Sequence, residues 1–158
     1  MENIRIRQAK LADVDGLVRL LKQISMLHHQ GRPDLFKPNS QKFSAEEIEK
    51  ILSDKDFKVF VAIDDKDCML GYCFCKLRSS SHPVLHTYTA LYIEDFCVDE
   101  SSRGQGIGKK LFDTALEYGK SQDVYNIELN VWNFNEGAVR FYESLGFSAR
   151  STVMERVL

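Results

Sequence analysis

The sequence has no apolar run near the roughly 20 residues that a membrane-spanning helix needs, and its start, MENIRIRQAK, lacks the apolar core of a secretion signal. It also has no marked excess of either charge, because 21 Lys and Arg residues stand against 23 Asp and Glu residues, a formal net charge of -2. A nearly neutral chain has no general attraction for nucleic acid or an anionic membrane. We therefore expect a cytoplasmic protein with neither a nucleic-acid nor a membrane partner.

Cysteine and histidine are scarce and form no metal-binding pattern. The adjacent His28 and His29 have no carboxylate or cysteine at ligand spacing. The cysteines contain no C-x-x-C pair and lie inside or beside apolar, strand-like runs: Cys68, Cys73, Cys75 and Cys97. We therefore expect reduced structural thiols and no bound metal.

Glycine, in contrast, is concentrated in one short run. Residues 103–108 read RGQGIG and follow a mostly apolar run, LYIEDFCV, at residues 91–98. Gly104, Gly106 and Gly108 allow positive φ and close backbone approach, so that N–H groups and the positive end of a following helix can converge on an anion. This order predicts a ligand that carries phosphate.

Spacing excludes two common glycine-rich motifs. A P-loop needs four residues between its glycines and then Lys followed by Ser or Thr, but Gly104 and Gly108 enclose three residues and Lys109 precedes Lys110. The dinucleotide fingerprint G-x-G-x-x-G also fails, since the glycines read G-x-G-x-G. Residues 103–108 instead fit R/Q-x-x-G-x-G/A and resemble the acyl-CoA pyrophosphate loop of the GNAT superfamily of N-acyltransferases.

A second segment resembles the same superfamily. Residues 135–147, NEGAVRFYESLGF, are similar to its N-x-x-A-x-x-F-Y-x-x-x-G-F segment at nearly every position. The resemblance implies acetyl-CoA as acetyl donor, bound without a metal. It also implies that the backbone of residues 96–98 pairs with the pantetheine amides like an added strand. The implied cofactor-binding residues are Phe96, Cys97, Val98, Arg103, Gly104, Gln105, Gly106, Ile107, Gly108, Lys109 and Asn135.

Transfer to an amine needs a base and an acid. An alkylammonium with a pKa near 10.4 is neutral in only about one molecule in a few thousand at pH 7. The resemblance assigns the base to Glu94, whose neighbour Asp95 is expected on the opposite strand face. It assigns protonation of the leaving sulfur to Tyr142. The alternatives are a salt-bridged strand-edge carboxylate, a core tyrosine with a backbone-bonded hydroxyl, and Cys97 as an acyl-carrying nucleophile.

Apolar periodicity predicts an α/β chain that forms one domain, residues 1–158, with about 70% of its unfolded surface buried. We expect helices at residues 11–27, 44–52, 108–119 and 138–145, with loops at 28–40 and 79–83. We expect strands at residues 4–7, 58–63, 69–77, 89–98, 125–132 and 147–158. The order matches the GNAT fold, an α+β arrangement in which helices flank a central, mostly antiparallel twisted sheet.

The resemblance implies an N-acetyltransferase that acts on the primary amine of a small molecule. The segment LYIEDF before RGQGIG is similar to spermidine/spermine N-acetyltransferases, which favours a polyamine or diamine. Residues 28–40 and 79–89 are the first candidates for choosing the acceptor. Aminoglycosides, amino acids, peptide or protein amines and a non-catalytic acyl-CoA-binding module are the alternatives, and a homodimer is compatible with the sequence.

Overall fold

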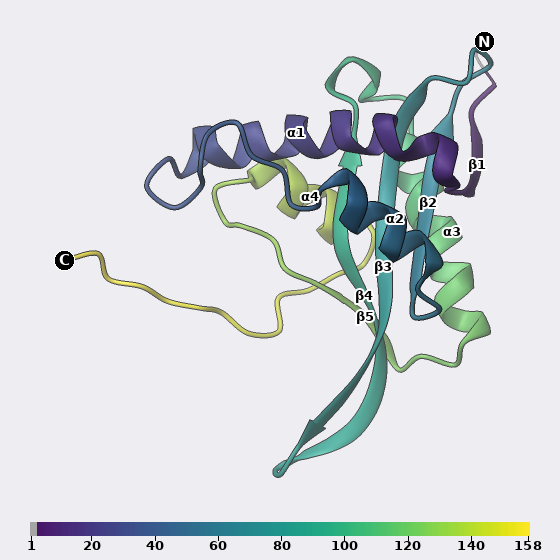
Figure 1. The fold of residues 1–158 in the computed structure, drawn as a ribbon. Coiled ribbons are helices and arrows are strands. Elements are labelled where there is room, and N and C mark those ends of the chain that lie inside the picture. The colour runs from purple at the N-terminus through teal and green to yellow at the C-terminus, as the bar shows by residue number, and fades with distance from the viewer. Residues whose placement is uncertain (1–2) are drawn as a thin grey trace.

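A five-stranded sheet forms the centre of the fold in the computed structural model, which describes residues 3–158 (Figure 1). The strands are β1 (Arg5–Gln8), β2 (Phe57–Ile63), β3 (Met69–His82), β4 (Leu85–Val98) and β5 (Asn126–Leu129), in that spatial order. Neighbours from β1 to β4 pair antiparallel, and the parallel β4–β5 pair makes the sheet mixed. The predicted α/β fold is confirmed.

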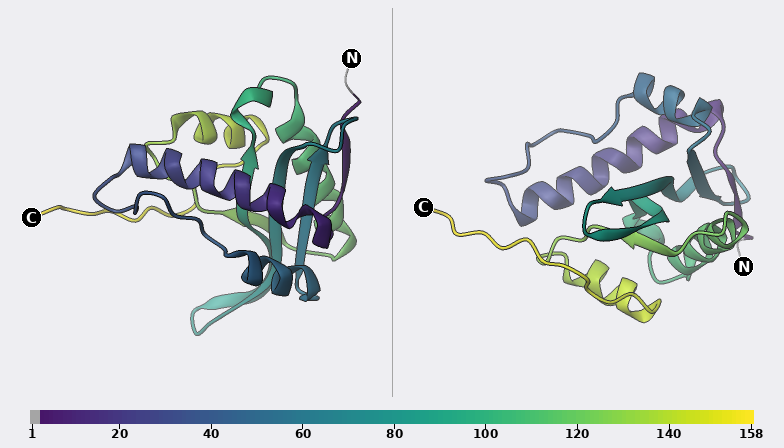
Figure 2. Two further views of the ribbon diagram at one scale, coloured as in Figure 1. Left: turned by 45° about the horizontal axis from the view of Figure 1, so that its top comes forward. Right: turned by 90° about the horizontal axis from the view of Figure 1, so that it is seen from below.

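Helices cover both faces of this sheet (Figure 2). They are α1 (Val14–Gly31), α2 (Ala45–Ser53), α3 (Ile107–Ser121) and α4 (Glu136–Ser144). α1 and α2 lie on one face, and α3 lies on the other with α4 beside it (Figure 2). Between residues 3 and 158, no helix has the length and apolarity required to span a membrane.

The continuous apolar run in β2 is explained by burial on both of its faces. Val59 and Val61 pack with Leu17 and Leu20 of α1, whereas the intervening Phe60 packs with side chains of α3. Because neighbouring side chains in a strand point to opposite faces, a strand covered by helices on both sides is apolar at every position. The two cores thus sandwich the sheet.

Two helix starts differ in how they are capped. Ser44 Oγ accepts from the Glu47 backbone N–H at 3.1 Å, which confirms the predicted cap of α2. Lys10 provides no such side-chain cap, so the chain first makes a 3₁₀ turn, Leu11–Asp13, and α1 begins at Val14. The Asp13 carboxylate accepts from the Lys10 backbone N–H at 2.8 Å.

Both predicted acceptor loops are shorter than expected. α1 continues to Gly31, so His28 and His29 are helical. β3 and β4 form one long hairpin that continues to His82 and Leu85, and its outer half projects from the sheet (Figure 1). The loop predicted at residues 79–83 is therefore largely strand, because cross-strand pairs such as Ser79 with Thr89 satisfy its backbone groups.

The strand predicted at residues 147–158 is wrong. Residues 147–158 contain no strand, and the end of the chain extends away from the body (Figure 1). Exposed apolar side chains occur along it, at Val153, Met154, Val157 and Leu158. Residues of high strand propensity form a strand only when a ladder partner is present, and this segment pairs with no strand of its own chain within residues 3–158.

Candidate functional site

The glycine-rich segment leads from a 3₁₀ turn, Glu100–Ser102, into α3. Gly104 and Gly106 have φ of 81° and 76°, and a Cβ at either position would meet nothing within 4 Å. Glycine is needed here for the left-handed backbone rather than for space. Gly106 is also the N-cap of α3 and offers no capping side chain, so it leaves the first-turn N–H groups available to an anion.

Gly108 serves a different purpose. A Cβ at this position would lie 2.9 Å from Cζ of Phe141, so glycine lets α3 and α4 approach closely. Phe141 also packs against Phe96 of β4, with ring centroids 5.7 Å apart. The two motifs predicted from the sequence therefore meet in space.

The polar side chains around the loop are partly engaged within the protein. Arg103 Nε donates to the Val98 carbonyl at 3.3 Å, and Lys109 Nζ lies 2.7 Å from Asp113 Oδ2 one turn along α3. Gln105 is exposed, and Ile107 is buried in the α3 core. Asn135 caps α4, since its Oδ1 accepts from the Ala138 backbone N–H at 3.2 Å.

We expect Gly106→Ala to weaken acetyl-CoA binding about tenfold, because a Cβ in the left-handed region costs about 1–2 kcal/mol that the loop relieves by leaving its anion-binding shape. Calorimetric titration with acetyl-CoA measures this. Gly146→Ala is the matched control, since Gly146 has φ of 94° and open space but lies beyond α4. Equal losses in both variants would show that the strain acts through overall stability.

One edge of β4 is free beside this loop. β5 pairs only with Ala90–Ile93, whereas Phe96, Cys97 and Val98 pair with β3 alone among the described residues. Backbone N–H and C=O groups on a free strand edge can pair with the amides of an extended ligand. The free edge runs from Val98, next to the phosphate loop, back toward Glu94.

A β-bulge at Glu94 changes which way the strand side chains point. The register passes from Cys75 opposite Ile93 to Phe74 opposite Asp95, so Glu94 is the extra residue. Leu91 and Ile93 pack on the α3 face, yet Cys97, of the same parity, packs on the α1 face. Both Glu94 and Asp95 therefore face α1 and α2, and the expectation that they lie on opposite faces is wrong.

The Asp95 carboxylate is partly buried and hydrogen-bonded within the site. Its Oδ1 accepts from the Tyr72 hydroxyl at 2.8 Å. Burial raises the pKa of Asp95 and outweighs the Tyr72 hydrogen bond and the charge of Lys42, both of which favour ionisation. Sequence reasoning gave Asp95 no role, because only the bulge brings it to the same face as Glu94.

Tyr142 lies at the other side of the β4 edge. Its ring packs against Phe96 and Phe147, with centroids 6.2 and 5.6 Å away. Burial, reinforced by the nearby Cys73, Asp95 and Cys97, raises the pKa of Tyr142. The hydroxyl therefore stays protonated at neutral pH, and no hydrogen bond from it to the backbone occurs within residues 3–158.

Cys97 is placed poorly for nucleophilic attack. Its thiol faces α1 and lies 3.9 Å from the Leu20 carbonyl oxygen. Burial raises the pKa of Cys97 to about 12, so almost no thiolate exists at neutral pH. Direct transfer from the thioester to the amine is the simpler chemistry here.

Lys42, which sequence reasoning missed, reaches this site from the segment between α1 and α2. Its Nζ lies 3.5 Å from Glu94 Oε2 and also donates to the Glu94 backbone carbonyl. Burial and the charge of Lys42 lower the pKa of His28, which keeps that imidazole neutral. No pattern in the sequence links residue 42 to residue 94.

Aromatic rings gather around His28, the imidazole that the charge of Lys42 reaches. Phe36 lies 5.0 Å from both His28 and Trp132 between ring centroids, and Trp132 stacks with Phe134 at 6.0 Å. Gly31 makes room for Phe134, because a Cβ there would lie 2.2 Å from the ring. These rings come from α1, the following loop and the segment after β5. In the sequence, this cluster is indicated only by three aromatic residues outside helices and strands, Phe36, Trp132 and Phe134.

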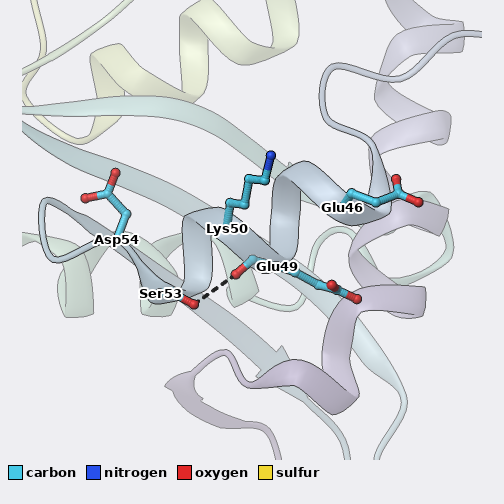
Figure 3. A pocket seen from close by; sticks show the side chains of 5 residues that line it. All are labelled: Glu46, Glu49, Lys50, Ser53 and Asp54. Carbon is cyan, nitrogen blue, oxygen red and sulfur yellow. Dashed lines mark hydrogen bonds between the residues drawn. The ribbon is translucent and has the colours of Figure 1, made fainter.

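A shallow depression elsewhere on the surface carries only exposed side chains. It lies on the outer side of α2 and is lined by Glu46, Glu49, Lys50, Ser53 and Asp54 (Figure 3). These residues are solvated and hydrogen-bond locally, as Ser53 does to the Glu49 carbonyl at 3.2 Å. Within residues 3–158, no three His, Cys, Asp or Glu side chains are grouped as a metal would require.

Known proteins resemble this chain along most of its length. Residues 24–147 match the family described as the acetyltransferase (GNAT) family. The structure of a mutant BH1408 protein from Bacillus halodurans has a TM-score of 0.94 and 32% sequence identity, covering 98% of this chain and 99% of that one.

Two curated relatives carry more specific names. Thialysine N-epsilon-acetyltransferase of Sus scrofa is 25% identical over 155 residues, 92% of this chain and 85% of that protein. N-alpha-acetyltransferase 30 of Schizosaccharomyces pombe is 35% identical over 88 residues, 56% of this chain. That match spans 55% of the yeast protein, about half its length.

Proposed function

Since the chain belongs to the GNAT acetyltransferase family, we propose that it transfers the acetyl group of acetyl-CoA to the primary amine of a small molecule. The observation that carries the proposal is the free edge of β4 at residues 96–98, which runs between the phosphate loop and the Glu94 bulge. We also propose that residues 1–158 act as one acetyltransferase domain.

Each part of acetyl-CoA has a suitable partner on this surface. The diphosphate binds the N–H groups of residues 104–108, and the pantetheine amides pair with the β4 edge. The thioester then lies near the bulge. Glu94 takes the proton from the ammonium, and the Tyr142 hydroxyl protonates the leaving sulfur. Asn135 supports the cofactor from the start of α4.

The acceptor is a small amine next to Lys42 and the aromatic rings. Polyamines and diamines fit the local similarity of residues 91–96, but the positive charge of Lys42 beside Glu94 disfavours a dense polycation. The relative named for thialysine matches 92% of this chain, which supports amines of the lysine type. A peptide or protein amine is the second candidate, favoured by the match to N-alpha-acetyltransferase 30.

Release of free CoA thiol from acetyl-CoA tests the proposal. We would measure it over a panel of diamines, polyamines, lysine-like amino acids, aminoglycosides and short peptides, with acetyl-CoA binding followed by calorimetry. Release that depends on a small amine supports the proposal and ranks acceptors. Release with peptides alone favours the second candidate. Binding without release favours a non-catalytic module, and absence of binding overturns the assignment of residues 103–108.

The exposed end of the chain supports a homodimer, and the free cysteines support a cytoplasmic location. Four apolar side chains lie in water along residues 153–158, and among described residues the outer edge of β5 has no partner. The tail of a second copy could extend the sheet at that edge. Unpaired thiols suit a reducing compartment. Sedimentation velocity should give a dimer for the full chain and a monomer for a chain ending at Arg150.

A further inference from the structure

Lys42 brings an amine of the protein itself to the carboxylate proposed as base. Its Nζ lies 3.5 Å from Glu94 Oε2, and the side chain is 43% exposed while that of Glu94 is 22% exposed. The second contact, from Nζ to the Glu94 backbone carbonyl, holds the ammonium at the bulge. The nitrogen is thus positioned as an acceptor amine would be.

The surroundings of Nζ favour a cation. The Phe43 ring centroid is 5.5 Å away, within the range of a cation–π contact. The charge of Lys42 also reaches Asp95, since it favours ionisation of that partly buried carboxylate. Two carboxylates and an aromatic face are the groups that an alkylammonium substrate would meet.

Other lysines are placed differently. Within residues 3–158, the lysines in the remaining ion pairs bond along their own helix, Lys109 to Asp113 and Lys120 to Glu117. Lys37 and Lys50 are exposed, and no carboxylate in the described part of the chain lies within ion-pair distance of either. Lys42 therefore differs from these in reaching across 52 residues of sequence to a strand of the sheet.

We propose that Lys42 is an acetylation site of this protein, modified by its own active site when no small amine is bound. This inference rests on the proposed function. Glu94 removes a proton from the Lys42 ammonium, and Nζ attacks the thioester carbonyl carbon. The N–C bond forms as the C–S bond breaks. Of the two protons that the nitrogen loses, one replaces the proton that Tyr142 gives to the CoA sulfur, and the other leaves through Glu94 to solvent.

Acetylation would change the site as well as the residue. The amide carries no charge, so the ion pair with Glu94 is lost and the base no longer has a competing cation of the protein beside it. Bound small amines and Lys42 should exclude one another, because both need the same carboxylate.

Mass spectrometry of the full chain tests the proposal. The purified protein is incubated with acetyl-CoA alone, and its peptides are mapped over time. We expect the mass of one acetyl group on Lys42 well before Lys37 and Lys50, which report background chemical acetylation. Glu94→Gln should slow the reaction at Lys42 about tenfold or more without changing the rate at Lys37. Excess of an accepted small amine should slow it too.

Two results would overturn the inference, and a third would remove this step alone. Acetylation of Lys42 no faster than that of Lys37 and Lys50, or at the same rate in Glu94→Gln, would overturn the inference. Amine-dependent CoA release without modification of Lys42 would leave the proposed function intact and remove only this step. Lys42→Arg, which keeps the positive charge, should acquire no acetyl group early in the reaction, and early modification of that variant would place the site elsewhere.

Discussion

Tyr142→Phe is expected to lower the turnover of amine acetylation tenfold or more while acetyl-CoA affinity stays nearly unchanged. The variant keeps the ring that packs against Phe96 and Phe147 and removes only the hydroxyl. In the proposed mechanism that hydroxyl donates its proton to the leaving sulfur, so its loss should act in the transition state rather than on binding. Steady-state kinetics and calorimetry, run on the same preparation, separate the two effects.

Tyr118→Phe provides a matched control. Tyr118 is a partly buried tyrosine near the far end of α3 from the glycine loop, and its ring packs against Phe60 at 6.1 Å. Turnover should be unchanged in this variant. Full turnover in Tyr142→Phe would remove Tyr142 as the acid, and a parallel loss in both variants would indicate a structural effect.

Glu94→Gln is expected to lower kcat/KM about 100-fold near neutral pH, and more at lower pH. Glutamine is nearly isosteric and keeps the extra residue of the bulge, so the strand register is preserved. Without a base, only acceptor molecules that are already neutral can react. Their fraction rises about tenfold per pH unit below the amine pKa, so the rate of the variant should rise steeply with pH while that of the wild type rises less.

The pH-rate profile is therefore the deciding measurement. Glu100→Gln, in the exposed turn before the glycine loop, should keep the wild-type profile. A Glu94→Gln profile parallel to wild type would count against the base, even if the overall rate fell. In that case Asp95, which faces the same side and contacts Tyr72, would be the next carboxylate to test.

The features predicted well depend on local chemistry. Glycine at positions 104 and 106 is required by positive φ, and the pattern of apolar residues reports the two faces of the sheet. The start of α2 was likewise readable, because the Ser44 cap and Glu47 are three residues apart. Each of these signals lies within a few residues of the structure that it specifies.

The features that the sequence does not predict depend on contacts between residues far apart in the chain. The last strand was predicted from composition, but strand formation needs a neighbour, and none of the described strands provides one. The approach of Lys42 to Glu94 depends on how the segment between α1 and α2 packs beside β4. The bulge is a mismatch between two strands, so neither strand shows it when read alone.

Because of the bulge, the presence of residue 94 determines which face of the sheet each earlier residue of β4 occupies. Removing this residue, instead of replacing its side chain, would restore alternation at this point of β4 and turn the residues before it, from 85 to 93, to the other face. Leu91 and Ile93 would leave the α3 core, and their neighbours Ala90 and Tyr92 would turn toward it. A single-residue deletion here should therefore prevent folding of the hairpin, whereas Glu94→Gln should fold normally. Folding thus depends more on the number of residues at this point of the chain than on the side chain of residue 94.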